Sequence, residues 1–149
     1  QTSRTARLMA EAGGRMPVVL AHHPFHQKAE VSKAVMRGGA EALRAWDACG
    51  PHVVLSGHLH AFLVEPFVAR EGDGRTLQVH CGSSASTRAR GNPNDLAVLD
   101  ITPRGVSVSR ATFTAGTGFS EVSRHRFSAG PSGWLRQTSD ARAAPRAPA

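Results

Sequence analysis

The sequence has no tyrosine, only two cysteines and few aromatic residues, which make up 5% of its 149 residues. Cys49 and Cys81 stand far apart and neither belongs to a Cys-x-x-Cys pair, so we expect no disulfide framework. We interpret both as small buried apolar side chains in a reduced protein. No apolar run approaches the ~18 residues that cross a bilayer, which predicts no membrane-spanning segment.

Acidic residues are also scarce: 11 stand against 18 basic ones, for a net charge of +7. A basic excess can indicate a phosphate-bearing partner. Here the arginines are spread along the chain and form no run with interleaved aromatics, so we expect no nucleic-acid partner. No secretory signal is recognisable, and a cytoplasmic location is the default expectation.

The first part of the chain alternates helical and strand-like patterns. Residues 2–12 read as a helix, "MPVVLAHHP" as a short buried strand, residues 33–49 as a second helix, and "HVVLSG" as a second strand. Val35, Met36, Ala40, Leu43 and Trp46 would form the apolar stripe of the second helix. Continuous apolar strands between helices predict an α/β fold with parallel strands.

From Ala61 onward the runs become short, partly alternating and separated by turn residues, which predicts consecutive antiparallel strands. "REGDGR" has the composition of a hairpin turn. Beyond Ser128 the chain is rich in Pro, Gly, Ala and Arg. We therefore expect one domain over residues 1–127 and a disordered tail over residues 128–149, with docking of Trp134 back onto the domain as an open alternative.

Six of the eight histidines fall between His22 and His60, at the ends of the two apolar strands. His22 and His23 end one strand, and His58 and His60 follow the other. Because ligands bind beyond the carboxyl ends of parallel strands, we expect these imidazoles to converge on a metal ion. His58 and His60 would project to the same side of an extended chain, with Gly57 taking the unusual backbone turn.

The other histidines have a plainer interpretation. His52, His80 and His125 are each isolated, and we expect them to be structural, hydrogen-bonded residues. His26 has two interpretations, a substrate contact or a loop residue.

The blocks "AHHP" and "GHLH", some 35 residues apart, resemble the last two signature blocks of the calcineurin-like metallophosphoesterases. The bacterial members of the cyclic-nucleotide phosphodiesterase type are the most similar. "CGSSASTRARGNPNDLAVLDI" also resembles a segment that follows the site in such members, and the likeness runs from Pro17 to Phe127. It implies a two-sheet αββα sandwich, of which this chain would be the C-terminal part with the N-terminal half absent.

The resemblance also implies site residues. His22 and His58 would bind the second of two metal ions and His60 the first, with His23 as the fallback for His22. Two divalent transition-metal ions (Mn, Fe or Zn) would activate a bridging water against a small-molecule phosphodiester. Arg88 would pair with a substrate phosphate or lie in an exposed loop.

The family's Asp-x-His, Gly-Asp and Gly-Asn-His blocks do not precede His22, and Asp47 and Asp73 lack the context to replace their carboxylates. The bridging aspartate and the acid histidine are therefore missing too. We expect a metal-dependent phosphoester hydrolase, of which the fragment formed by these 149 residues is inactive by itself. The alternative is a metal-binding or degenerate remnant domain without catalysis.

Overall fold

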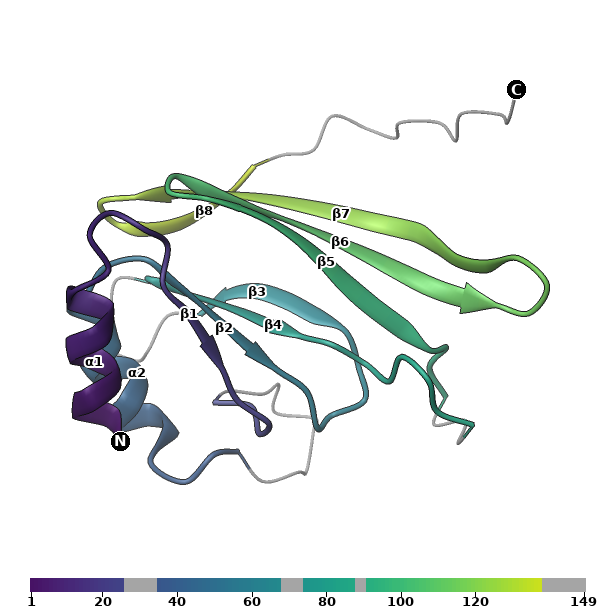
Figure 1. The fold of residues 1–149 in the computed structure, drawn as a ribbon, viewed down its shortest axis with the longest axis horizontal. Helices are drawn as coiled ribbons and strands as arrows, with labels where there is room; N and C mark the ends of the chain where they lie inside the picture. Colours follow the sequence, from purple (N-terminus) through teal and green to yellow (C-terminus); the bar gives the residue numbers. More distant parts are fainter. Residues whose placement is uncertain (26–34, 68–73, 88–90, 138–149) are drawn as a thin grey trace.

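A computed structural model describes residues 1–25, 35–67, 74–87 and 91–137. The described part forms three layers: two helices, a mixed sheet and an antiparallel sheet (Figure 1). Along the chain the elements are α1 (Thr2–Ala10), β1 (Val18–Leu20), α2 (Gly39–Asp47), β2 (His52–Ser56), β3 (Leu63–Phe67), β4 (Thr76–His80), β5 (Asp95–Thr102), β6 (Gly105–Thr114), β7 (Gly118–Gly130) and β8 (Gly133–Gln137). The expected α/β class with two sheets is confirmed.

The first sheet has the strand order β1-β2-β4-β3, with β1, β2 and β4 parallel and β3 antiparallel to β4. Its central strand β2 is buried on both faces, because successive side chains point to opposite sides. Val53 enters the core between the two sheets, while Val54 enters the core under the helices. This double burial explains why "HVVL" is apolar without alternation.

The two helices cover one face of the first sheet. Met9 from α1 and Leu43 and Trp46 from α2 form a core with Val54 of β2. Neither helix, at nine residues each, is long and apolar enough to cross a membrane, and no other helix occurs in the described residues.

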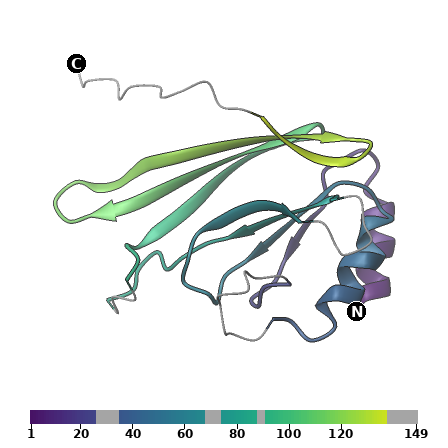
Figure 2. The same ribbon diagram turned by 180° about the vertical axis from the view of Figure 1, so that it is seen from behind.

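The second sheet, β5-β6-β7-β8, is antiparallel throughout and covers the other face of the first sheet. Seen from behind, it and the helices again lie on opposite sides of the first sheet (Figure 2). Val108 and Phe127 from this sheet meet Leu77 and Val79 from β4 in the larger core.

The predicted boundary between domain and tail at residue 127 is wrong. Strand β7 continues to Gly130 and β8 follows it, with Trp134 only 6% exposed. The Trp134 Nε1–H donates to the carbonyls of His52 and Arg75, at 3.1 and 2.8 Å. One buried indole thus holds β8 on the first sheet, although the composition around it resembles a tail. Residues 138–149 lie outside the described part.

The second helix starts later than predicted. Gly38 has φ +71°, a left-handed conformation that interrupts the helix, so α2 begins at Gly39. Leu43 and Trp46 are buried as expected, but Ala40 and Val35 are exposed. Predicted helical residues 33 and 34 lie outside the described part.

Two of the predicted antiparallel strands belong to the first sheet. β3 and β4 form a hairpin, as the "REGDGR" turn predicts, although residues 70–73 of that turn are outside the described part. β4 also pairs in parallel with β2, and all five of its residues are buried. Cys49 and Cys81 are both free thiols, as predicted, but half-buried rather than buried.

Candidate metal centre

Three histidines meet where the neighbouring parallel strands β1 and β2 end. His22 and His23 follow β1, and His58 follows β2. Pairing continues past the strands, since the Ala21 N–H donates to the Leu55 carbonyl and the Gly57 N–H to the His22 carbonyl, at 2.9 and 3.2 Å. The two loops therefore leave the sheet side by side, which brings the imidazoles together.

The imidazole nitrogens are spaced for coordination. One ring nitrogen from each of His22, His23 and His58 lies within 4.8 Å of the other two. His58 Nδ1 and His22 Nε2 are 3.2 Å apart. Two nitrogens bound tetrahedrally at 2.0–2.1 Å from zinc are about 3.4 Å apart, so this pair already has a suitable separation. His22 and His23 are exposed and His58 is half-buried, which leaves the group open to solvent.

The backbone at His58 is strained. The Leu59 N–H donates to the Gly57 carbonyl at 2.8 Å, which closes a three-residue γ-turn around His58 with φ +67°. Such turns with positive φ are rare, and a non-glycine residue there costs about 1–3 kcal/mol. Among the described non-glycine residues, positive φ occurs at His58 and His60 only. Strain concentrated on two histidines points to a site.

The expected geometry of the "GHLH" block is therefore wrong in one respect. The left-handed turns are made by His58 and His60 rather than by Gly57, so the segment is not extended and the two rings do not project as an i, i+2 pair. His60 is not part of the three-histidine group. Its Nδ1 instead lies 2.6 Å from Ser83 Oγ, in the loop after β4.

The donor set of the group fits one divalent transition-metal ion. Three neutral imidazoles with an open fourth position are a known zinc arrangement. Within the described residues, no carboxylate joins this group, and Asp47 lies on α2 instead. The predicted His22 and His58 and the fallback His23 are thus brought together, whereas a dinuclear arrangement is not seen among them.

His52 and His80 are structural residues, as predicted. His52 is fully buried, its Nδ1 donating to the Gly50 carbonyl and its Nε2 paired with Thr76 Oγ1, both at 2.9 Å. Burial lowers the pKa of His52, and its hydrogen bond to Gly50 and the charge of Asp47 offset this only in part. His80 Nδ1 lies 2.6 Å from Ser56 Oγ inside the sheet.

His125 lies on β7 and stacks on the ring of Phe62. Burial and the nearby Arg136 guanidinium lower the pKa of His125. Its aromatic neighbour agrees with the structural role predicted for it. The two predicted substrate-binding residues, His26 and Arg88, lie outside the described residues.

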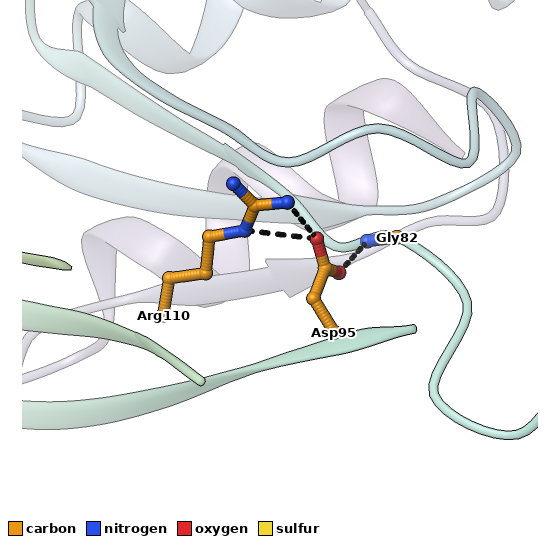
Figure 3. Close-up of polar contacts among 3 residues, drawn as sticks. All are labelled: Gly82, Asp95 and Arg110. Atoms are coloured by element: carbon orange, nitrogen blue, oxygen red, sulfur yellow. Dashed lines mark hydrogen bonds and ion pairs between the residues drawn. The ribbon is translucent and has the colours of Figure 1, made fainter. Parts of the chain in front are cut away.

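Sequence reasoning did not single out Ser83 or the buried ion pair beneath it. Asp95 is 1% exposed and accepts two hydrogen bonds at Oδ2 from Arg110, from Nε at 2.9 Å and Nη2 at 2.7 Å. Its Oδ1 accepts the Gly82 N–H at 2.7 Å (Figure 3). Ser83, Asp95 and Gly82 all belong to the segment "CGSSASTRARGNPND", which was the only signal available.

No family model and no curated protein matches this chain. Among solved structures, it is similar to a single mutant of Vps29 from Entamoeba histolytica, with 15% identity and a TM-score of 0.40 over 72% of this chain. The match spans 53% of the Vps29 chain, about half its length.

Proposed function

We propose that this chain supplies histidine ligands to a divalent metal centre that hydrolyses a phosphoester. The observation that carries the proposal is the convergence of His22, His23 and His58 at the carboxyl ends of two parallel strands, with the strained turn at His58. A backbone strained at an imidazole is expected where that imidazole must hold a fixed direction. The order of the "AHHP" and "GHLH" blocks supports phosphoester chemistry in particular.

In this proposal, the four imidazoles of the two blocks have different roles. His22 and His58 bind the same ion, since their nitrogens are 3.2 Å apart. His23 is the adjacent donor. It either joins His22 and His58 on this ion or takes the place of His22. His60 binds the other ion, on the side of the site that faces the loop after β4. A bound ion would polarise the phosphoryl oxygens and lower the pKa of a coordinated water.

The protein surface around the group suits an anionic substrate. His22 and His23 are exposed in the described part of the chain, which leaves their rings accessible to a phosphate group. The net charge of +7 attracts a phosphodiester by long-range electrostatics. Arg88 remains our proposed phosphate contact.

A dinuclear centre also needs a bridging carboxylate. No Asp-x-His, Gly-Asp or Gly-Asn-His block precedes His22 to supply it, and Asp73 of the later Gly72-Asp73 pair lies outside the described residues. We therefore propose that hydrolysis depends on ligands outside these residues.

The test is hydrolysis of bis-p-nitrophenyl phosphate by the full-length gene product with Mn²⁺. We expect metal-dependent turnover that His58→Ala lowers by more than the roughly 10- to 100-fold typical for loss of an outer-shell partner. His125→Gln, which changes a histidine on β7, is the matched control and should retain activity. Unchanged turnover in His58→Ala would refute the proposal.

One observation favours a second candidate, a metal-binding domain without catalysis. The three-histidine group contains no carboxylate among the described residues, so it offers ligands for one ion and no bridge to another. Stoichiometric metal binding by a full-length product that never cleaves the substrate would select this candidate.

A further inference from the structure

A short hydrogen bond joins two loops near the proposed metal site, and the proposed function assigns it no role. His60 Nδ1 and Ser83 Oγ are 2.6 Å apart and partly buried. His60 follows β2 and Ser83 follows β4, and these strands are parallel neighbours whose last paired residues are Ser56 and His80. The contact therefore lies at the same sheet edge as the three-histidine group.

Ser83 does not depend on a ligand for its position. Its carbonyl accepts the Asp95 N–H at 2.9 Å, and the preceding Gly82 N–H donates to the Asp95 carboxylate at 2.7 Å. Asp95 itself accepts hydrogen bonds from Nε and Nη2 of Arg110 (Figure 3). A buried residue of the second sheet thus fixes the main chain on either side of the Gly82–Ser83 peptide.

The same arginine also contacts the loop that carries His60. The Arg110 guanidinium lies 5.2 Å from the ring centroid of Phe62, two residues beyond His60. Arg110 therefore fixes both loops relative to each other. A single hydrogen bond between two loops does not need such support. Contacts of Arg110 with both loops are expected where the His60 side chain must keep one orientation.

The hydrogen bond permits two proton arrangements, because a hydroxyl both donates and accepts. If Ser83 Oγ accepts the Nδ1–H, Nε2 of His60 carries the lone pair. If Ser83 donates, Nε2 carries the proton and cannot coordinate. Metal-bound histidines usually donate their other ring N–H to an oxygen atom.

We infer that Ser83 is a positioning residue that accepts the Nδ1–H of His60 and so presents Nε2 to a metal ion. The inference rests on the proposed function, since it takes His60 to be a metal ligand. Asp95 and Arg110 hold Ser83 in place for this role.

The test reads the His60 tautomer by ¹⁵N NMR on the metal-free protein with labelled histidine, and by titration the affinity for the second Zn²⁺ equivalent, the one assigned to His60. Wild type should show the Nδ1–H form. Ser83→Ala should mix the two tautomers and weaken binding by about 10- to 100-fold, and Ser83→Thr, which keeps a hydroxyl, should restore both. Ser84→Ala removes the neighbouring, exposed hydroxyl and should change neither.

An Nε2–H form of His60 in wild type would overturn the inference, and this result needs no variant that folds. A Ser83→Ala protein with a lower melting temperature but the wild-type tautomer and Zn²⁺ affinity would overturn it as well, because Ser83 would then be merely structural. Neither readout uses a phosphoester, so failure of hydrolysis is recorded separately from failure of this positioning role.

Discussion

At the scale of single residues, the metal ligands that the β1 side of the site supplies are the two histidines after β1, His22 and His23. The two consecutive histidines there are both exposed, and both place a ring nitrogen within 4.8 Å of His58 and of each other. The ring centroids of His23 and His58 are 4.4 Å apart, and those of His22 and His58 are 5.1 Å apart. Coordination depends on the nitrogens rather than the ring centroids, and His58 Nδ1 lies 3.2 Å from His22 Nε2.

We predict that His22→Ala weakens Zn²⁺ binding more than His23→Ala, because His22 Nε2 and His58 Nδ1 already have the separation of two ligands on one ion. Isothermal titration calorimetry of both variants at pH 7.5 measures this order. A larger loss in His23→Ala would make His23 the primary ligand after β1.

Buried His52 gives a prediction about pH. Its pKa is lower in the folded protein than the ordinary 6.5, so below that pH the unfolded chain binds more protons than the folded one. Its stabilising contribution is therefore complete above about pH 6.5 and is lost as the pH falls toward the folded-state pKa. The free energy of unfolding should fall from pH 7 to pH 5.

Urea unfolding of wild type and His52→Gln at both pH values tests this. The variant should be less stable throughout, but its stability should depend less on pH. His125, whose pKa is also lowered, contributes with the same sign, so His125→Gln is the comparison for a half-exposed histidine. An equal pH dependence in wild type and His52→Gln would contradict the assignment.

At the scale of elements, the loop after β4 is held against the second sheet because the main chain of Gly82 closely approaches the Asp95 carboxylate. Gly82 has no room for a side chain, because a Cβ there would overlap the Asp95 carboxylate. That carboxylate is fixed from the other side by Arg110. The loop can therefore accept no methyl group without moving Asp95.

We predict that Gly82→Ala destabilises the protein by about 1–3 kcal/mol, the usual cost of overpacking a tight site. Gly57→Ala is the matched control, because a Cβ at Gly57 meets nothing within 4 Å and its φ is not positive. Thermal and urea unfolding compare the two. Equal stability of both variants would show that the Asp95 contact adapts freely.

The elements also show what sequence could predict. The meeting of His22 with His58 was predictable, because apolar runs of this kind form neighbouring parallel strands whose carboxyl ends coincide. The partner of His60 was not, because Ser83 is 23 residues away in another loop and serine has no distinctive pattern. The left-handed turns at His58 and His60 were not predictable either, since Gly57 is the residue that tolerates such a turn most easily.

At the scale of the whole molecule, two sheets share one core, and the last strand closes it. Sequence predicted two kinds of strand but assigned β8 to a tail, because Gly and Pro flank Trp134 and little around it is apolar. The contact that decides its place is long-range: Trp134 reaches carbonyls of His52 and Arg75 on the first sheet. Composition alone does not contain such a contact.

We predict that Trp134→Phe destabilises the protein by about 1–3 kcal/mol, since it leaves two main-chain carbonyls without their indole donor while keeping an aromatic ring. Leu135→Ala, at the exposed neighbour on β8, should change stability by less than about 0.5 kcal/mol. Urea unfolding followed by circular dichroism distinguishes the two. Equal effects would place β8 outside the cooperative core.

Zinc X-ray absorption spectroscopy on the metal-loaded full-length protein tests the central claim, that the loops after β1 and β2 form one metal centre. The account predicts at least two imidazole nitrogens at about 2.0–2.1 Å from zinc, with the loss of one in His58→Ala. A ligand shell of oxygen alone, or one that His58→Ala leaves unchanged, would contradict it.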